Sequence, residues 1–273
     1  MDRGEWEGRV GRKWAEEWRR TDRSFAGLTD QLIARASARP VSRALDVGCG
    51  AGELSLALAR GHPASQVIGL DVSEDLIEAA RERAGNLANA SFLVDDASTW
   101  RGSSFAADLV VSRHGVMFFA DPVAACTNLA RGAAPDARLV FSCFRDRREN
   151  PWAVQVAALL PEGSVAETPA DAPGPFAFAD RDRVQRILEA AGWAEVSFET
   201  VDFAYIAGAG ENAVEDAVSF FQAIGPAARA AAGLDQPARE AFAERLRRYL
   251  CGHAQGQLVA LPGAAWIVSA RSR

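Results

Sequence analysis

The chain is organised around Ala44-Leu45-Asp46-Val47-Gly48-Cys49-Gly50-Ala51-Gly52-Glu53-Leu54. Apolar residues flank the acid Asp46, glycines follow at alternate positions, and Leu54, Ala57 and Leu58 then recur at helical spacing. This order predicts a strand, a tight turn and a helix. The glycines would let the main chain turn sharply and approach a ligand without intervening side chains. The helix would direct its free N–H groups and its positive dipole end at that ligand.

The glycine spacing separates two classes of nucleotide-binding protein. Gly48, Gly50 and Gly52 follow the pattern G-x-G-x-G, whereas dinucleotide sites have G-x-G-x-x-G. The third glycine therefore comes one residue early for a dinucleotide site, and an acid, Asp46, lies two residues before the first. An NAD-dependent oxidoreductase is accordingly the less favoured alternative, and NADH binding would test it.

The segment from Leu45 to Gly52 resembles motif I of the class I S-adenosylmethionine (SAM)-dependent methyltransferases. It is most similar to the branch of the ubiquinone and menaquinone C-methyltransferases and small-molecule methyltransferases. The resemblance implies SAM as cofactor, with S-adenosylhomocysteine as product. It also implies a Rossmann-like doubly wound α/β sheet of seven strands, mostly parallel with the last strand antiparallel. The residues of motif I expected to bind SAM are Asp46, Gly48, Cys49, Gly50 and Gly52.

The rest of the chain alternates apolar runs with helical patterns, as parallel doubly wound sheets with right-handed crossovers do. Strands are expected at 44–47, 66–71, 91–94, 108–112, 138–144, 196–205 and 265–270. Helices are expected at 52–60, 74–84, 122–133, 149–160, 180–191 and, interrupted near 225–226 and 233–237, at 211–251. Two further helices are expected within residues 1–40.

Acids follow two of the expected strands. Asp71 ends the second strand, close to where a nucleotide-binding βαβ unit has its ribose-binding acid. The resemblance gives Asp71 and the adjacent Val72 this role toward the adenosyl ribose; the alternative is a solvated acid or a helix N-cap. After the third strand come Asp95, Asp96 and Ala97, where the family has Gly-Asp-Ala. The resemblance favours Asp96, with Ala97, as the adenine-binding residue, and Asp95 is the alternative.

The fourth strand leads into Arg113-His114-Gly115-Val116-Met117-Phe118-Phe119, which resembles motif IV of this branch. Ligands of open α/β sheets bind outside the carboxyl ends of the strands, so Ser112 and Arg113 are expected at the cofactor. His114 is the candidate general base, because imidazole titrates near neutral pH. The alternative is a histidine that only packs near the cofactor. The segment lacks the Asn/Asp-Pro-Pro-aromatic signature of enzymes that methylate nucleobase amines or protein glutamine.

The remaining segments are interpreted as additions to a nucleotide-binding core. Residues 1–40 are expected to form an N-terminal helical lid and residues 41–145 the SAM-binding core. Residues 146–273 would complete the core and carry helical cap insertions at about 146–179 and 206–253. Trp14 of the lid is expected on the cofactor; the alternative is that it packs one helix on the core.

The acceptor is less defined than the cofactor. Aromatic residues are frequent after the fourth strand, which favours a small apolar or aromatic acceptor methylated at O, C or N. Arg113 and Arg145 could neutralise an acidic acceptor. The fold does not identify the acceptor. A non-catalytic SAM-binding regulatory protein is the alternative from another class.

The amino-acid composition limits the kinds of binding partner that the protein is expected to have. The chain has 273 residues, of which 49% are hydrophobic and 24% charged, as in ordinary soluble proteins. Its net charge of -6 disfavours a nucleic-acid partner. Four scattered cysteines and three histidines predict no metal site. No apolar run resembles a signal peptide or a membrane span, so we expect a cytoplasmic protein with a small-molecule partner. The oligomeric state stays open, a homodimer included.

Overall fold

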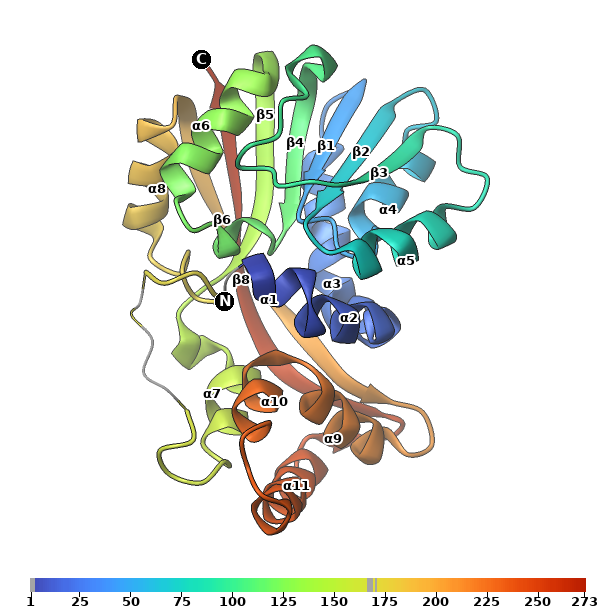
Figure 1. Cartoon of the computed structure of the whole chain (residues 1–273), viewed down its shortest axis with the longest axis vertical. Coiled ribbons are helices and arrows are strands. Elements are labelled where there is room, and N and C mark those ends of the chain that lie inside the picture. Colours follow the sequence, from blue (N-terminus) through green and yellow to red (C-terminus); the bar gives the residue numbers. More distant parts are fainter. Residues whose placement is uncertain (1–2, 166–168, 170) are drawn as a thin grey trace.

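The computed structural model describes residues 3–165, 169 and 171–273. Its strands are β1 (Arg43–Val47), β2 (Gln66–Asp71), β3 (Ala90–Val94), β4 (Ala107–Arg113), β5 (Ala133–Phe144), β6 (Trp193–Ala209), β7 (Ala254–Gln255) and β8 (Leu258–Ser272). They form one sheet of order β3-β2-β1-β4-β5-β8-β6, and β7 pairs with β8 (Figure 1). Strands β1 to β5 are parallel to one another, whereas β8 is antiparallel to β5 and β6. The sheet is therefore the Rossmann-like, mostly parallel α/β sheet with an antiparallel last strand that the sequence predicts.

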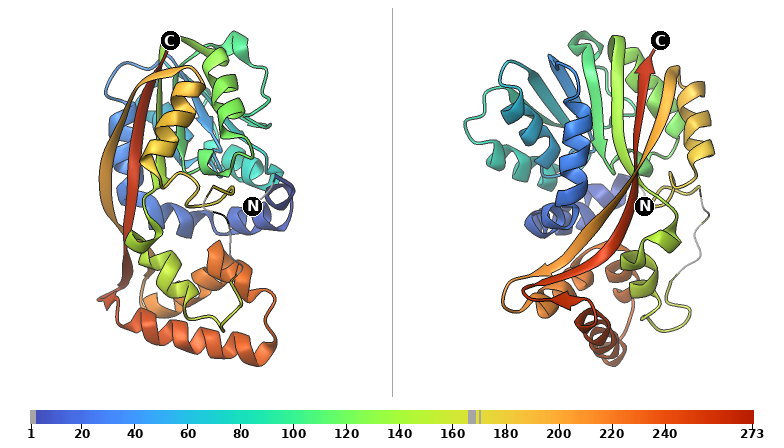
Figure 2. Two further views of the ribbon diagram at one scale, coloured as in Figure 1. Left: turned by 90° about the vertical axis from the view of Figure 1, so that its left-hand side faces the viewer. Right: turned by 180° about the vertical axis from the view of Figure 1, so that it is seen from behind.

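The described residues form eleven α-helices, some of which cover the two faces of this sheet. They are α1 (Arg3–Glu7), α2 (Arg9–Glu16), α3 (Trp18–Ala36), α4 (Glu53–Gly61), α5 (Glu74–Ala84), α6 (Pro122–Gly132), α7 (Pro151–Ala157), α8 (Arg181–Ala190), α9 (Ala213–Ala223), α10 (Gly225–Ala231) and α11 (Gln236–Cys251). Helices α6 and α8 contact each other on the face turned to the viewer in Figure 1. Helix α3 covers the opposite face, which the right-hand view of Figure 2 shows. The core between them is apolar and includes the fully buried Leu28, Leu109, Phe141 and Trp193.

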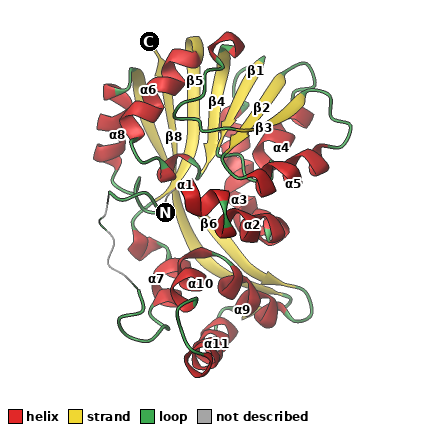
Figure 3. Cartoon of the chain, viewed as in Figure 1, coloured by secondary structure: helices red, strands yellow, loops and turns green. Residues whose placement is uncertain are grey.

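Two strands reach far beyond the others. β6 has 17 residues and β8 has 15, and β5 pairs with β8 only from Ala265 onward. Below that point β6 and β8 continue as a two-stranded ribbon, from the pair Asp202–Ala264 to the pair Ala209–Leu258. The ribbon carries α9, α10 and α11, and α7 packs beside it; Figure 3 shows these helices as a separate group below the sheet. We call the ribbon with these four helices the helical lobe.

The strand ribbon corrects the lengths expected from the sequence. The expected strands 196–205 and 265–270 were too short because the glycines beyond them suggest loops. In the structure Gly208 lies within the ribbon, where a Cβ atom would stand 1.9 Å from the carbonyl oxygen of Ala213. Glycine is thus required there by the close approach of α9, and it does not end the strand. The β7–β8 hairpin was also not expected.

The N-terminal segment was expected to hold two helices and holds three. Gly8 and Glu17 have non-helical dihedral angles and separate α1, α2 and α3. Of the residues that the structure describes, none belongs to a helix long and apolar enough to cross a membrane.

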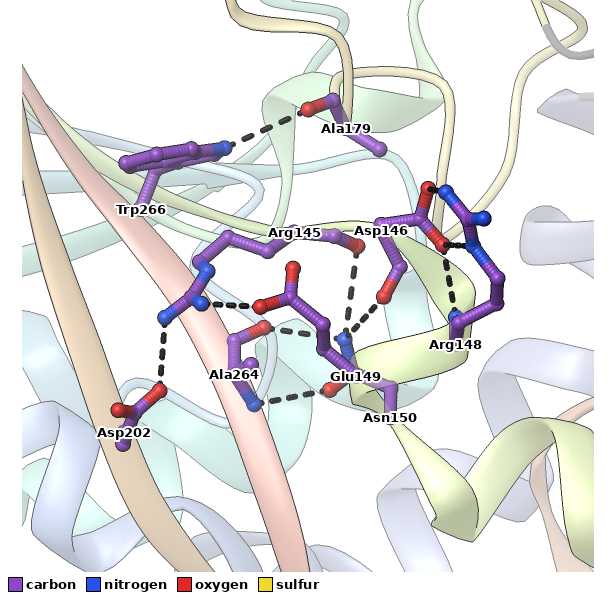
Figure 4. Close-up of polar contacts among 9 residues, drawn as sticks. All are labelled: Arg145, Asp146, Arg148, Glu149, Asn150, Ala179, Asp202, Ala264 and Trp266. Carbon is purple, nitrogen blue, oxygen red and sulfur yellow. Dashed lines mark hydrogen bonds and ion pairs between the residues drawn. The ribbon is translucent and has the colours of Figure 1, made fainter.

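A buried amide joins the start of α7 to strand β8 where the ribbon leaves the sheet. The Asn150 Oδ1 atom accepts hydrogen bonds from the main-chain N–H of Ala264 and from Nε1 of Trp152, both at 3.0 Å (Figure 4 shows the Ala264 contacts). Its Nδ2 atom donates to the carbonyl oxygens of Asp146 and Ala264, both at 3.1 Å. Asn150 therefore fixes the start of α7 on β8 and orients the Trp152 ring.

Asn150→Ala should lower the free energy of unfolding by about 3 kcal/mol, because it leaves buried donors and acceptors unpaired. Urea unfolding followed by circular dichroism measures the change. Gln155→Ala, which truncates an exposed amide of α7, is the control and should cost less than about 0.5 kcal/mol. Equal losses of unfolding free energy in the two variants would show that the Asn150 side chain contributes no more to stability than an exposed amide.

Candidate functional site

A large cleft opens between the carboxyl ends of the parallel strands and the helical lobe. Its volume is about 2460 Å³. Ligand pockets are usually about 300–1,000 Å³, so this cleft has room for a cofactor and a second molecule. Residues of α1, α2 and α3 line one part, the loops after β1, β2, β3 and β4 line the floor, and α7 and α10 line the far part. Figure 1 shows α1 and α2 between the sheet and the helical lobe.

The glycine loop forms the floor of the cleft. Gly48, Gly50 and Gly52 all have positive φ angles, of 64°, 54° and 84°. A Cβ atom on Gly48 would stand 2.8 Å from Cα of Gly115, so the loops after β1 and β4 are in main-chain contact. A Cβ atom on Gly50 would have no other atom within 4 Å. Gly50 thus presents bare main chain to open space in the cleft.

Asp71 is hydrogen-bonded to this loop. Its Oδ2 atom accepts from the N–H of Gly50 at 2.9 Å, and its Oδ1 atom accepts from the N–H of Ser73 at 3.0 Å. Burial raises the pKa of Asp71, against the effect of these bonds. Each oxygen keeps a second lone pair, and Asp71 and Val72 both line the cleft. The carboxylate can therefore still accept hydroxyl groups of a ligand.

Asp46 lies beneath the loop and is almost fully buried, with 1% of its surface exposed. Ser55 donates to its Oδ2 atom at 2.6 Å. Its Oδ1 atom has no hydrogen-bond partner among the residues that the structure describes. Burial raises the pKa of Asp46 to about 6, although the Ser55 bond and the charge of Arg113 act in the other direction. The neighbouring Cys49 is also buried, which raises the pKa of its thiol well above the usual value.

Both acids after β3 line the cleft. Asp95 is exposed and accepts from the N–H of Asp96 at 2.7 Å. Asp96 is half-buried, and its Oδ1 atom accepts from the N–H and the hydroxyl of Ser98 at 2.8 and 2.6 Å. Ala97 is buried beside them. The choice between Asp95 and Asp96 as adenine partner stays a prediction.

Ser112 differs from its expected position. Its buried side chain is not among the residues that line the cleft. Its hydroxyl donates to the carbonyl oxygen of Val47 at 2.6 Å and accepts from the N–H of Gly115 at 3.0 Å. The Ser112 side chain therefore holds the ends of β1 and β4 together and does not face a ligand.

The two arginines suggested to neutralise an acidic acceptor both form ion pairs with carboxylates of this chain. Arg113 lines the cleft, but it pairs with Asp22 at 3.1 Å and with Glu53. Arg145 lies outside the cleft lining and pairs with Glu149 and, at 2.7 Å, with Asp202 (Figure 4). Intramolecular carboxylates thus neutralise both cations.

His114 lies where the floor of the cleft meets the far part. Its φ angle is 62°, and its ring stacks on Phe144 with centroids 4.0 Å apart and planes 13° apart. Only 8% of its surface is exposed, and neither ring nitrogen has a hydrogen-bond partner among the described residues. Burial, together with the charge of Arg113, lowers the pKa of His114 to about 3. The imidazole is therefore neutral throughout the physiological pH range.

An aromatic wall continues from His114 into the helical lobe. Trp152 stacks on Tyr205 with centroids 5.1 Å apart, and it contacts Phe144 at 4.9 Å and Phe176 at 6.1 Å. Not all aromatic residues after the fourth strand reach the cleft: Phe178, Phe203 and Phe220 do not line it and belong to the core. Sequence reasoning missed Phe25, which lines the cleft from α3; its spacing with Leu28 and Leu32 indicated only a packed helix face.

The N-terminal helices line one side of the cleft. Trp14 lines the cleft and contacts Trp6, with ring centroids 5.7 Å apart, and Trp6 meets Phe118 at 5.2 Å. Glu5 of α1 pairs with Arg229 of α10 at 2.6 Å, which links α1 to the helical lobe.

These features, a glycine loop and strand-end acids at the carboxyl edge of a Rossmann-like sheet, define a nucleotide-binding α/β protein of the methyltransferase type. Residues 39–192 match the family described as methyltransferase domain, and the chain belongs to this class I SAM-dependent methyltransferase family. The resemblance of motifs I and IV is thereby confirmed at the family level. The narrower similarity to quinone C-methyltransferases stays a prediction.

Named relatives agree with this family. Trans-aconitate 2-methyltransferase of Variovorax paradoxus is 30% identical over 61% of this chain and 60% of its own length. The matched region thus spans less than two thirds of that relative. Phosphoethanolamine N-methyltransferase 2 of Haemonchus contortus, solved with SAM, has a TM-score of 0.54 and 14% identity over 96% of this chain and 57% of that one. The [4+2]-cyclase SpnF has a TM-score of 0.52 and 22% identity over 90% and 80% of the two chains. These two structures show a shared fold alone.

Gly50→Val should abolish binding of S-adenosylhomocysteine, because a branched side chain would occupy the open space above the loop. Calorimetric titration measures the affinity. Gly85→Val is the matched control: Gly85 has nearly the same φ angle, 53°, and equally open surroundings, but it lies outside the cleft lining. It should be similarly strained and retain binding. Unchanged affinity in a folded Gly50→Val variant would remove Gly50 from the site.

Proposed function

We propose that this protein is a SAM-dependent methyltransferase that methylates a small organic acceptor with an apolar or aromatic body at O, C or N. The observation that carries the proposal is one cleft with two chemically different parts. Its floor combines the bare main chain of Gly50 with the acids Asp46 and Asp71. Its far part is the aromatic wall around Trp152, and His114 lies between the two.

The floor suits SAM on two observations. Gly50 leaves open space above the loop, and the Oδ1 atom of Asp46 is a buried acceptor without a partner among the described residues. An ammonium group such as that of the methionine part of SAM would satisfy this carboxylate. In the same proposal Asp71 accepts the ribose hydroxyls, Asp95 or Asp96 binds the adenine amino group, and Val72 and Trp14 contact the adenosyl part.

When bound, SAM would supply an already activated methyl group. The residues of this chain then have mainly to hold the acceptor in line and to exclude water. We assign water exclusion to α1 and α2, which we interpret as part of a lid of residues 1–40. The ion pair of Asp22 with Arg113 and the pair of Glu5 with Arg229 hold this lid on the core and on the helical lobe. Residues 41–145 would be the SAM-binding core, and 146–179 and 206–253 the cap.

His114 would act as a neutral partner of the acceptor. A group with a pKa near 3 is a weak general base at neutral pH, since catalytic bases work best near the operating pH. Its two free nitrogens can nevertheless accept or donate one hydrogen bond each and so orient an acceptor hydroxyl or amine. The alternative is that the ring only packs on Phe144.

Two alternatives make different predictions. A non-catalytic SAM-binding protein would bind SAM without turnover; the open far part of the cleft favours an enzyme instead. An NAD-dependent oxidoreductase would bind NADH. The [4+2]-cyclase SpnF shares this fold, so the fold alone does not define the reaction.

The test is calorimetric titration of the purified protein with SAM, S-adenosylhomocysteine and NADH. Binding of the first two and not the third supports the proposal and justifies a screen of phenols, quinones and amines with labelled SAM. Binding of NADH alone would overturn it. If nothing binds, mass spectrometry of the denatured protein reports a co-purified ligand, and without one the proposal fails.

The variant His114→Phe distinguishes a role of His114 in orienting the acceptor from a role in packing alone. If His114 orients the acceptor, this variant should keep its affinity for S-adenosylhomocysteine but lose about tenfold or more in kcat/KM, because the ring stays stacked and the nitrogens are lost. The wild-type rate should also lack an inflection near pH 6.5, since the neutral form persists well below that pH. A fully active His114→Phe with a weakened His114→Ala would leave only the packing role.

A further inference from the structure

Three arginines lie in one turn between β5 and α7, and their surroundings differ. Arg145 pairs with Glu149 and Asp202, and Arg148 pairs with Asp146 at 2.8 Å (Figure 4). Both of these arginines lie outside the lining of the cleft. Arg147 lines the cleft and has no carboxylate partner within salt-bridge distance among the described residues.

Arg147 is an exposed residue on a turn that is itself well anchored. Its guanidinium carbon lies 5.4 Å from the ring centroid of Phe176, which continues the aromatic wall. The turn that carries it is capped by Asp146, whose Oδ1 atom accepts from the N–H of Arg148 at 2.8 Å. Asn150 binds the carbonyl oxygen of Asp146 and anchors the whole turn on Ala264 of β8. Arg147 thus places an exposed cation at the edge of an apolar surface.

The other cations around the far part of the cleft are engaged. Arg229 pairs with Glu5 at 2.6 Å. Arg183 donates to the carbonyl oxygen of Ala177 at 2.6 Å, and Arg239 donates to that of Leu234 at 2.8 Å. Among the described residues, Arg147 differs from them in that its guanidinium makes no hydrogen bond or salt bridge; it lies against the Phe176 ring and feels the charge of the adjacent Asp146.

We infer that Arg147 binds an anionic group of the acceptor, so that the acceptor is a monoanion with a planar apolar body, such as an aromatic carboxylate. This inference rests on the proposed function and adds the charge of the acceptor to it. The aromatic wall of Phe144, Trp152 and Phe176 would hold the planar body, and Arg147 would pair with the anionic group at its end. A tricarboxylate such as trans-aconitate would bring two further charges against the apolar rings of this wall, so we expect it to bind poorly.

The experiment uses the full chain saturated with S-adenosylhomocysteine and two pairs of probes of equal shape. The pairs are 4-hydroxybenzoate with 4-hydroxybenzamide and 4-hydroxycinnamate with its amide; trans-aconitate is the fifth probe. Calorimetry gives each dissociation constant for the wild type and for Arg147→Ala, Arg147→Lys and Arg148→Ala. Arg148 is the matched control, because it is the adjacent arginine of the same turn and does not line the cleft.

The wild type should bind at least one carboxylate about tenfold more tightly than its amide and more tightly than trans-aconitate. Arg147→Ala should remove this preference, Arg147→Lys should keep part of it, and Arg148→Ala should keep it all. Retained preference in Arg147→Ala, no preference in the wild type, or no carboxylate binding would each overturn the inference, as would tighter binding of trans-aconitate. In all these cases intact binding of S-adenosylhomocysteine leaves the proposed function standing. Its absence would refute the proposed function and this inference together.

Discussion

The main chains of Gly48 and Gly115 lie in direct contact, and the site is built on this contact. A Cβ atom on Gly115 would stand 2.5 Å from the carbonyl oxygen of Val47, so no other residue fits there without a shift. Ser112 holds the contact by bonding both loops. Because the loops after β1 and β4 meet here, the glycine loop and His114 are brought to the same edge of the sheet.

The long β6–β8 ribbon adds the second half of the cleft. It extends the sheet past this edge and carries the helical lobe to a place opposite the glycine loop. Asn150 fixes the junction and the Trp152 ring at once. Acidic, hydrogen-bonding groups therefore face aromatic ones across the cleft, an arrangement that suits the proposed transfer from a polar cofactor to an apolar acceptor.

Elements whose boundaries are determined by the local sequence were predicted correctly. The boundaries of β2 and α5 can be read directly from the sequence between Gln66 and Ala84, because the apolar periodicity and the N-cap Ser73 determine them. The lengths of β6 and β8 could not be predicted from the sequence, because they depend on pairing between residues that are distant along the chain. The same holds for the site: strand-end acids such as Asp71 were found by position, whereas the burial of Ser112 and the cleft position of Arg147 arise only from tertiary packing.

Asp46 permits the most direct test of the claim that SAM lies on the glycine loop with its ammonium group over this carboxylate. With a pKa raised to about 6, Asp46 is mostly protonated near pH 5, and a bound cation favours its ionised form. Titration with S-adenosylhomocysteine near pH 5, in buffers of different ionisation enthalpy, should therefore release up to about one proton. The release should vanish near pH 8 and in Asp46→Asn. Binding without proton release in the wild type, or with the same release in Asp46→Asn, would contradict the account.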